Sequence, residues 1–388
     1  MKYYIISGEA SGDLHGSNLI KQLHRQDPSA EIRCWGGELM QQAGATLVKH
    51  YRELAFMGFA EVVKNLPTIL QNMKFCKQDI LSFQPEVLVL IDYPGFNLRI
   101  AEWGKQQGFT IAYYISPQVW AWKANRVKKM KQCIDLMLCI LPFEKDYYRD
   151  QWNWAVEYVG HPLVEVIEEK KSGVSSLESE LANHETTPDS RLQTPDSNLI
   201  ALLPGSRKQE IHKKLPIMLG VAKSFPDYQF VVAKAPGLED AFYEPFLVAY
   251  QNVSSVRNQT YDLLLNAKAA LVTSGTATLE TALFGVPEVV CYRGSNISYQ
   301  IAKRLIKIKY ISLVNLIMDK EVVKELIQGE LTTKNLVAEL TLLLTDKARQ
   351  QAIQKDYASL KTLLAAGGNA SAKAAEKIIH LGNSSRSK

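Results

Sequence analysis

The residues that could carry chemistry stand where short apolar runs of the sequence end. Asp92 directly follows the apolar run Val87–Ile91. A carboxyl group that leaves a buried parallel strand at its carboxyl end is partly desolvated, and this raises its pKa towards neutrality. Asp92 is therefore the first candidate for a general base. The alternative interpretation is that Asp92 caps the next helix.

A second acidic segment, GEASGD at residues 8–13, follows the first apolar run of the chain. Its glycine spacing does not match G-x-G-x-x-G, and the carboxylates of Glu9 and Asp13 would repel a pyrophosphate at a helix start. Carboxylates beside small residues suit a neutral, hydroxyl-rich ligand. Capping of a helix by Ser11 or Asp13 is an equally good interpretation.

The second half of the chain has a segment suited to binding an anion, after the apolar run Leu199–Leu203. Gly205 and Ser206 allow backbone N–H groups to approach a phosphate, and Arg207 offers a bidentate guanidinium. The following residues have a helical pattern, so a helix N-terminus would add its positive dipole end.

The segment SGTATLE, Ser274–Glu280, repeats this arrangement after another apolar run. Two helix starts suited to anions predict diphosphate binding in this half of the chain. The sequence has no Asp-x-Asp near a predicted strand end and no His, Cys or carboxylate cluster with metal-ligand spacing. We expect helix dipoles and Arg207, not a metal, to stabilise the anion.

Aromatic and basic residues adjoin in YISPQVWAW, residues 114–122, which runs into the basic segment Lys123–Lys131. Such a segment can hold a sugar face and a phosphate, or lie at a membrane interface. Spacing alone favours a third interpretation, a solvated basic helix face with buried tryptophans.

An amphipathic stripe occupies residues 59–70. Its apolar side chains fall on one side of a helical wheel, although Pro67 should kink or divide the helix. Burial of each side chain stabilises by about 1.5–3 kcal/mol in protein or in acyl chains alike, so energy does not separate core packing from membrane contact. The stripe consists of Phe59, Val62, Val63, Leu66, Ile69 and Leu70.

The elements that must position these residues are alternating strands and helices. Such alternation predicts parallel sheets covered on both faces, here in two doubly wound α/β domains. The predicted strands are Tyr3–Ser7, Ile32–Trp35, Val87–Ile91, Ile111–Ile115, Leu136–Ile140, Leu199–Leu203, Phe230–Ala233, Val253–Val256, Ala269–Val272 and Val289–Cys291. Two such domains in tandem would form a crevice between the carboxyl ends of their sheets.

Length and composition agree with two globular domains. The chain has 388 residues, against a prior of roughly 150 per domain, with 46% hydrophobic and 22% charged residues. Wholesale disorder is excluded, and a net charge of +5, from 45 basic and 40 acidic residues, does not indicate nucleic acid binding. The five cysteines form no Cys-x-x-Cys pair, which favours a reducing compartment.

The expected domain boundaries follow these patterns. Residues 1–165 form the first domain, 166–198 a Ser-, Glu- and Thr-rich linker, 199–345 the second domain and 346–388 terminal helices. An ordered loop is the alternative for the linker. His161 is expected to mark the end of the first domain. The N-terminus lacks the apolar core of a signal peptide, so we expect a chain that is not exported across the membrane. No apolar run reaches about 18 residues, so we expect no membrane-spanning helix, although the chain could bind to a membrane surface.

Nine strings, taken in order, resemble the lipid-A-disaccharide synthase family over nearly the whole chain except residues 170–198. They are GEASGD, LAFMGFAEV, IDYPGFN, YISPQVWAW, LPFEK, YVGHPL, LLPGSR, SGTATLE and YISLVNL. The resemblance implies a GT-B glycosyltransferase fold, with two Rossmann-like domains facing across a crevice and a last helix that crosses back to the first domain. It also implies transfer of 2,3-diacylglucosamine from its UDP donor to 2,3-diacylglucosamine 1-phosphate, which forms a β-1′,6-linked disaccharide and releases UDP, with no metal and no cofactor.

The resemblance also gives the residues their roles. Asp92 would take the proton of the acceptor 6-hydroxyl, Glu280 would bind ribose hydroxyls, and Asn315 would lie in the donor site. The diphosphate would be held by Gly205, Ser206, Arg207, Gly275 and Thr276. The acceptor side would be lined by Glu9, Ser11 and Asp13. The family commonly has proline where this chain has Val314, which weakens the assignment of Asn315.

Implied partners are the two lipid substrates and the inner face of the inner membrane, which the stripe and the basic segments Lys123–Lys131 and Lys303–Lys309 would meet. We do not expect nucleic acid as a partner, and a homodimer is compatible with the sequence. Two rival functions stay open at this stage. One is another UDP-sugar enzyme of the same fold, such as a 2-epimerase, which needs no lipid acceptor. The other is a non-catalytic lipid-binding protein.

Overall fold

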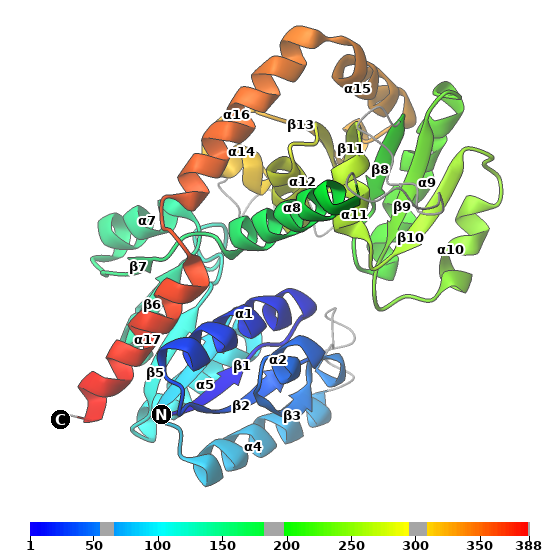
Figure 1. Cartoon of the computed structure of the whole chain (residues 1–388). Helices are drawn as coiled ribbons and strands as arrows, with labels where there is room; N and C mark the ends of the chain where they lie inside the picture. The colour runs from blue at the N-terminus through cyan, green and yellow to red at the C-terminus, as the bar shows by residue number, and fades with distance from the viewer. Residues whose placement is uncertain (55–65, 182–197, 295–308, 387–388) are drawn as a thin grey trace. The chain divides into compact units, whose positions relative to one another are not determined.

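The chain divides into two compact units, each built around a parallel sheet (Figure 1). The computed structural model describes residues 1–54, 66–181, 198–294 and 309–386. Unit 1 comprises Met1–Pro162 and Leu364–Lys388, and unit 2 comprises Leu163–Leu363. The predicted α/β class, with two doubly wound parallel sheets, is confirmed.

The sheet of unit 1 has the strand order β3-β2-β1-β4-β5-β6-β7, with every described pair parallel. Its central strands are continuous apolar runs because helices cover both faces. The strands are β1 Lys2–Ile6, β2 Glu31–Gly36, β3 Thr46–His50, β4 Val87–Ile91, β5 Thr110–Tyr114, β6 Leu136–Cys139 and β7 Glu157–Tyr158.

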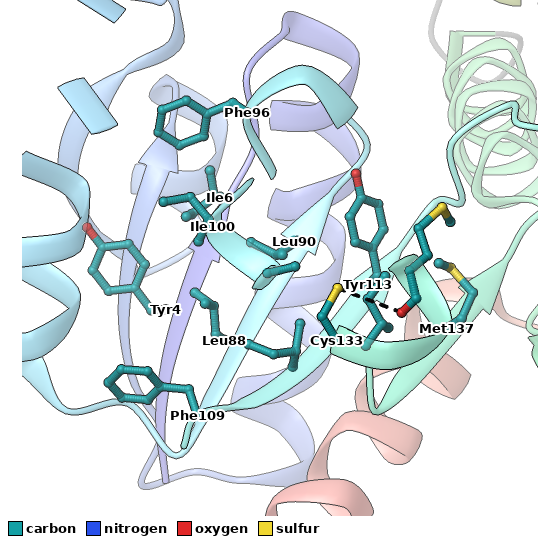
Figure 2. Packing of buried hydrophobic residues seen from close by; sticks show 14 of the residues in the cluster. Tyr4, Ile6, Leu88, Leu90, Phe96, Ile100, Phe109, Tyr113, Cys133 and Met137 are labelled. Carbon is teal, nitrogen blue, oxygen red and sulfur yellow. Dashed lines mark hydrogen bonds between the residues drawn. The ribbon is translucent and has the colours of Figure 1, made fainter. Parts of the chain in front are cut away.

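Alternate residues of these strands supply the two cores of unit 1. Tyr4 and Ile6 of β1 and Leu88 and Leu90 of β4 point to one face, where Phe96 and other helix side chains pack on them (Figure 2). The helices on this face are α4 Leu66–Phe83, α5 Pro94–Gln106 and α6 Arg126–Cys133.

The opposite face is covered by α1 Ala10–Gln26 and α17 Ala370–Arg386, which pack on each other. The last helix therefore belongs to the same unit as the N-terminus. Gly382 of α17 packs closely on Met1 and Val87, and a side chain there would displace them. Unit 1 is completed by α2 Glu38–Gln42, η1 Tyr51–Glu53 and α7 Pro142–Trp152.

The sheet of unit 2 has the order β10-β9-β8-β11-β12-β13 and is also parallel. Its strands are β8 Leu199–Leu203, β9 Gln229–Lys234, β10 Val253–Arg257, β11 Ala269–Thr273, β12 Glu288–Tyr292 and β13 Lys324–Ile327. Its helices are α8 Pro162–Leu181, α9 Lys208–Gly220, η2 Val221–Ser224, α10 Asp240–Leu247, α11 Thr260–Asn266, α12 Thr276–Phe284, α14 Leu313–Met318, η3 Gln328–Glu330, α15 Thr333–Thr345 and α16 Lys347–Ala365.

Every predicted strand is present, and the structure adds β3, β7 and β13, each at the edge of a sheet. A break at Gly367-Gly368 separates α16 from α17. There the backbone of Gly367 lies directly on that of Gly160, so neither position has room for a side chain. His161 is buried beside this contact, and its N–H donates to the carbonyl of Leu364 at 3.2 Å.

The segment expected as a linker begins inside a helix. Residues 166–181 belong to α8, and residues 182–197 lie outside the described residues. Pro67 does not divide the described helix either, because it stands in the first turn of α4, where a missing N–H costs no hydrogen bond.

Both sheets have a topological switch point, where successive connections turn to opposite sides of the sheet. In unit 1 it lies between β1 and β4, and in unit 2 between β8 and β11. The loops at the carboxyl ends of these strand pairs are where open α/β sheets bind ligands. Residues 7–9 and Asp92 occupy the first position, and residues 204–207 and 274–275 the second.

Candidate active site

The backbone at Asp92 is held in a conformation that few non-glycine residues adopt. Asp92 and Tyr93 have φ angles of 43° and 47°, in the left-handed region. The Asp92 N–H donates to the Tyr114 carbonyl at 3.1 Å, and the Asp92 carbonyl accepts bonds from Asn97 Nδ2 at 2.8 Å and the Tyr113 hydroxyl at 2.5 Å. These bonds hold a strained turn that aims the Asp92 side chain, as is common at functional sites.

The Asp92 carboxyl group has an environment suited to proton transfer. Burial raises its pKa to about 7, and the negative charge of Glu9, across the switch point, adds to the rise. A hydrogen bond from the Tyr93 backbone acts in the opposite direction. A base whose pKa lies near the working pH combines a useful ionised fraction with good proton affinity.

The loops after β1 and β4 are in direct contact. The ring of Tyr93 lies against Gly8, where a side chain would overlap it. The same ring stacks on Phe96, with centroids 5.7 Å apart, and the Tyr93 hydroxyl donates to the Leu54 carbonyl at 3.3 Å. Gly8 is thus required by the close approach of a ring that helps to fix the Asp92 turn.

The side chain of Asp13 is used inside unit 1. It is buried, and its carboxylate accepts backbone N–H bonds from Gly37 at 2.7 Å, Leu39 at 3.2 Å and Met40 at 3.1 Å. These are the free N–H groups at the start of α2, so Asp13 caps that helix and not its own. We assign Asp13 to this capping role instead of a contact with a ligand. Ser11 is exposed and Glu9 is half-buried.

In unit 2, the loop between β8 and α9 presents an arginine beside an uncapped helix start. Gly205 has φ 111°, which favours glycine, and a side chain there would meet Glu210. Arg207 is the N-cap residue of α9, which has no side-chain cap bond, and 55% of its side chain is exposed. Its guanidinium lies 3.3 Å from Glu210 Oε1. The free N–H groups and the guanidinium can meet the same anion.

The loop between β11 and α12 forms the neighbouring helix start. Gly275, with φ 146°, and Thr276 are both exposed. The hydroxyl of Thr278 donates back to the Gly275 carbonyl at 2.8 Å, and that of Ser274 donates to the Ile311 carbonyl at 2.8 Å. The loop is therefore held from both sides while its N–H groups at the helix start stay available.

A buried lysine that the sequence does not reveal lies beneath these two loops. Lys214 of α9 is 3% exposed, donates to the Thr273 hydroxyl at the end of β11, and lies 3.6 Å from Glu210 Oε2. Burial lowers its pKa, and the nearby carboxylate of Glu210 partly restores it. In sequence Lys213-Lys214 has the composition of a solvated helix face, so only the fold shows that Lys214 is buried beneath these two loops.

Glu280 lies on α12, the helix that begins at the loop after β11. It accepts a hydrogen bond from the Tyr261 hydroxyl at 3.0 Å, and burial raises the pKa of its carboxyl group. Its side chain retains partial exposure. A carboxyl group held in this way has a second oxygen that can accept bonds from ligand hydroxyl groups.

The sequence as a whole matches one family. The model of the lipid-A-disaccharide synthetase family matches residues 3–379. The lipid-A-disaccharide synthase of Syntrophus aciditrophicus is 37% identical over 372 residues, which cover 94% of each chain. That of Geobacter metallireducens is 37% identical over 94% of this chain and 93% of its own. The chain belongs to the lipid-A-disaccharide synthase family. Members of the lipid-A-disaccharide synthase family are glycosyltransferases, so the protein is an enzyme of that class.

Solved structures agree with the GT-B fold of the lipid-A-disaccharide synthase family. A UDP-GlcNAc 2-epimerase from Neisseria meningitidis, solved with UDP-GlcNAc, superposes with a TM-score of 0.66 at 12% identity over 98% of this chain and 99% of its own. A glycosyltransferase of kitacinnamycin superposes with a TM-score of 0.64 at 13% identity over 98% of each chain. At these identities the likeness shows the fold alone.

Resemblance to the lipid-A-disaccharide synthase family places Asn315 in a donor site, but here its side chain is fully engaged within unit 2. Asn315 is buried, its Oδ1 accepts the N–H groups of Val322 and Val323 at 2.8 and 3.0 Å, and its Nδ2 donates to the Val323 carbonyl and Glu325. Glu325 also accepts the N–H of Ile311, whose carbonyl accepts the Ser274 hydroxyl. Asn315 therefore positions the loop before α12 through this network.

Asn315→Ala is expected to lower the free energy of unfolding by about 1–3 kcal/mol, because two buried N–H groups lose their acceptor. The loosened loop should also raise the KM for the donor. Chemical denaturation and initial rates measure the two effects. Asn335→Ala is the matched control, because that side chain makes an exposed bond to Glu330. Loss of turnover at unchanged stability and unchanged donor KM would instead assign Asn315 to the chemistry.

The predicted amphipathic stripe falls largely outside the described residues. This applies to Phe59, Val62 and Val63, and to the side chain of Leu66. At its described end, Ile69 is half-buried and 56% of Leu70 is exposed. Within the described ranges, no helix is long and apolar enough to cross a membrane. The described residues also bring together no group of three or more His, Cys, Asp or Glu side chains that could hold a metal ion.

Proposed function

We propose that the protein transfers 2,3-diacylglucosamine from its UDP donor to 2,3-diacylglucosamine 1-phosphate. The products are the β-1′,6-linked disaccharide 1-phosphate and UDP. Membership of the family gives the reaction class, and the observation that carries the proposal is the half-buried carboxyl group of Asp92, with a pKa of about 7, at the switch point of unit 1.

The proposed chemistry is one inverting displacement. As the acceptor O6 attacks the anomeric carbon of the donor, its proton passes to the Asp92 carboxylate, and the bond from that carbon to the UDP oxygen breaks. The rigid turn at Asp92 limits the geometries that its carboxylate can take. Glu9 and Ser11 at the neighbouring loop are the proposed acceptor contacts, and Asp13 supports them by capping α2.

The proposed donor site is the pair of helix starts in unit 2. The N–H groups after Gly205, Ser206, Gly275 and Thr276 and the guanidinium of Arg207 would hold the diphosphate. Glu280 would accept bonds from the ribose hydroxyl groups. The positive charge of Arg207, with Lys214 behind the loops, would stabilise the negative charge that develops on the leaving UDP.

The test is an assay of the full-length protein with UDP-2,3-diacylglucosamine and 2,3-diacylglucosamine 1-phosphate, with the products identified by mass spectrometry. We expect disaccharide and UDP in equal amounts, no turnover without acceptor, and the same rate with EDTA. Interconversion of UDP-sugars without acceptor would favour the epimerase instead. Loss of the rate with EDTA and its recovery with Mg²⁺ would contradict the metal-independent reaction.

We further infer that the protein works at the inner face of the inner membrane, because both proposed substrates carry acyl chains and the stripe at residues 59–70 is amphipathic. Wild-type protein should then sediment with phosphatidylglycerol vesicles, and the triple change of Val62, Val63 and Leu66 to Ser should prevent this while the protein stays folded. Unfolding of that variant would instead place these residues in a core.

A further inference from the structure

Two cations lie on one exposed indole in the loop after β5. Lys123 Nζ lies 4.1 Å from the ring centroid of Trp122, and the guanidinium carbon of Arg126 lies 5.7 Å from it. Half of the Trp122 side chain is exposed. We call Trp122, Lys123 and Arg126 the indole cation pair. Cation–π contact partly compensates each charge but leaves the hydrogen-bond donors of both cations free for a ligand.

The indole cation pair has no anionic partner in the part of the chain that the structure describes. By contrast, Lys129, which lies on α6 with Arg126, pairs with Glu102 at 2.7 Å. Burial and the neighbouring positive charge of Arg126 both lower the pKa of Lys123. Two like charges held together without a counter-ion repel each other, and a bound dianion would relieve this repulsion.

The pair stands at the same sheet edge as the proposed general base. Loop residues 115–125 follow β5, the strand next to β4, and so leave the same sheet edge as Asp92. The Tyr113 hydroxyl donates to the Asp92 carbonyl. Besides burial, the charges of Asp92 and Arg126 both act on the pKa of this hydroxyl, in opposite directions. Arg126 and Asp92 therefore share a neighbour.

The loop that carries the pair is fixed by buried polar contacts. Trp120 Nε1 donates to the buried carboxyl group of Glu144 at 3.2 Å, and the hydroxyl groups of Ser116 and Tyr148 lie 2.7 Å apart. Ile115 and Lys123, at the two ends of the loop, have φ angles of 66° and 57°. A β-branched residue in this region is costly and persists only where its surroundings hold it. A site on this loop is thus preorganised.

We propose that Lys123 and Arg126 bind the phosphate monoester of the acceptor sugar, with the indole of Trp122 against the sugar. The inference rests on the proposed function, which supplies a sugar with a 6-hydroxyl and a 1-phosphate. In such a sugar the 1-phosphate is attached to carbon 1, and the 6-hydroxyl is on the carbon attached to carbon 5. Carbons 1 and 5 both bond to the ring oxygen, so when the 6-hydroxyl meets the base, the phosphate must bind within the length of one sugar ring from it. Asp92 follows β4, and Arg126 begins α6 after the loop that leaves the neighbouring strand β5, so both stand at one sheet edge, as this requirement demands.

The test compares initial rates on 2,3-diacylglucosamine 1-phosphate and on the same lipid without phosphate, both in detergent micelles. We expect Arg126→Ala and Lys123→Ala to lower kcat/KM on the phosphorylated acceptor by about 10–100-fold, mainly through its KM. The rate on the unphosphorylated acceptor and the KM for the donor should be unchanged. Lys128→Ala, which removes an exposed charge from the same helix, is the matched control.

Three results would overturn the proposal. The first is an equal loss on both acceptors, and the second is the same loss in Lys128→Ala. The third is a loss seen only with phosphatidylglycerol vesicles and not in micelles, which would assign the pair to the membrane surface. Calorimetric titration of wild type and Arg126→Ala with the phosphorylated lipid in micelles decides the matter without turnover. If wild type binds this lipid more than tenfold more tightly than Arg126→Ala does but makes no disaccharide, the proposed function fails and the phosphate site stands.

Discussion

Asp92→Asn is expected to lower kcat by about 10²–10⁴-fold, the usual contribution of a positioned general base. Asparagine has nearly the same shape, and the bonds that hold the turn come from the backbone of residue 92, so the turn should persist. The KM for the donor should change little, because the proposed donor site lies in unit 2. Initial rates with both substrates measure the effect. Retention of wild-type kcat would exclude Asp92 as the base.

The pH dependence gives the same prediction a second readout. Since the base must be ionised and its pKa is about 7, kcat/KM of the wild type should rise through about pH 7 and level off above it. The residual activity of Asp92→Asn should lack this rise. A wild-type rise centred well below pH 6 would contradict the buried environment of the carboxyl group.

Stability should change in the opposite direction to activity. The folded protein keeps the Asp92 proton up to about pH 7, whereas the unfolded chain releases it near pH 4. The free energy of unfolding therefore falls across this interval as the partly desolvated carboxyl group ionises. Below about pH 4 the free energy of unfolding of Asp92→Asn should not exceed that of wild type. Above pH 7 it should exceed the wild-type value by roughly 1–4 kcal/mol. Denaturation of both proteins at pH 5 and pH 8 provides the comparison.

Arg207→Ala is expected to lower kcat/KM for the donor by about 10²–10³-fold. The reason is that the exposed guanidinium at the start of α9 is the proposed main source of positive charge for the leaving diphosphate. Arg207→Lys should recover only part of the loss, because an ammonium group lacks the bidentate fork. Donor titrations at saturating acceptor measure the effect.

Arg257→Ala is the control for this prediction, because it removes an arginine of the same unit that pairs with Asp240 at 2.9 Å. A comparable loss in Arg257→Ala would mean that net charge, not the site, sets the affinity. An effect of Arg207→Ala confined to the acceptor KM would move Arg207 out of the donor site.

The sequence predicted the central strands well and the edges poorly, for a physical reason. Strands such as β4 and β11 are buried on both faces and are written as unbroken apolar runs. Of the four edge strands β10 was predicted, whereas β3, β7 and β13 were not; these three are largely half-exposed, each holds at least one charged residue, and β7 has only two residues. Natural edges carry such residues to avoid pairing with other chains, and this composition removes the signal on which strand prediction depends.

For the candidate site, position along the chain was informative and side-chain partners were not. Asp92, Gly205 and Arg207 could be proposed as site residues because ligand loops follow the carboxyl ends of strands. That Asp13 caps α2, or that Asn315 binds Glu325, depends on segments brought together only by folding. Lys214 was missed for the same reason, because its burial comes from the approach of β11.

The contact of Gly8 with the ring of Tyr93 has a consequence for how this sequence can diverge. The ring fills the space that a side chain at position 8 would need, so any larger residue there must displace Tyr93 and, with it, the turn that holds Asp92. A change at either position is therefore acceptable only together with a compensating change at the other. We expect homologues to inherit the two positions as a pair, glycine with an aromatic residue or a larger residue with a smaller partner, although the motifs that contain them lie far apart in the chain.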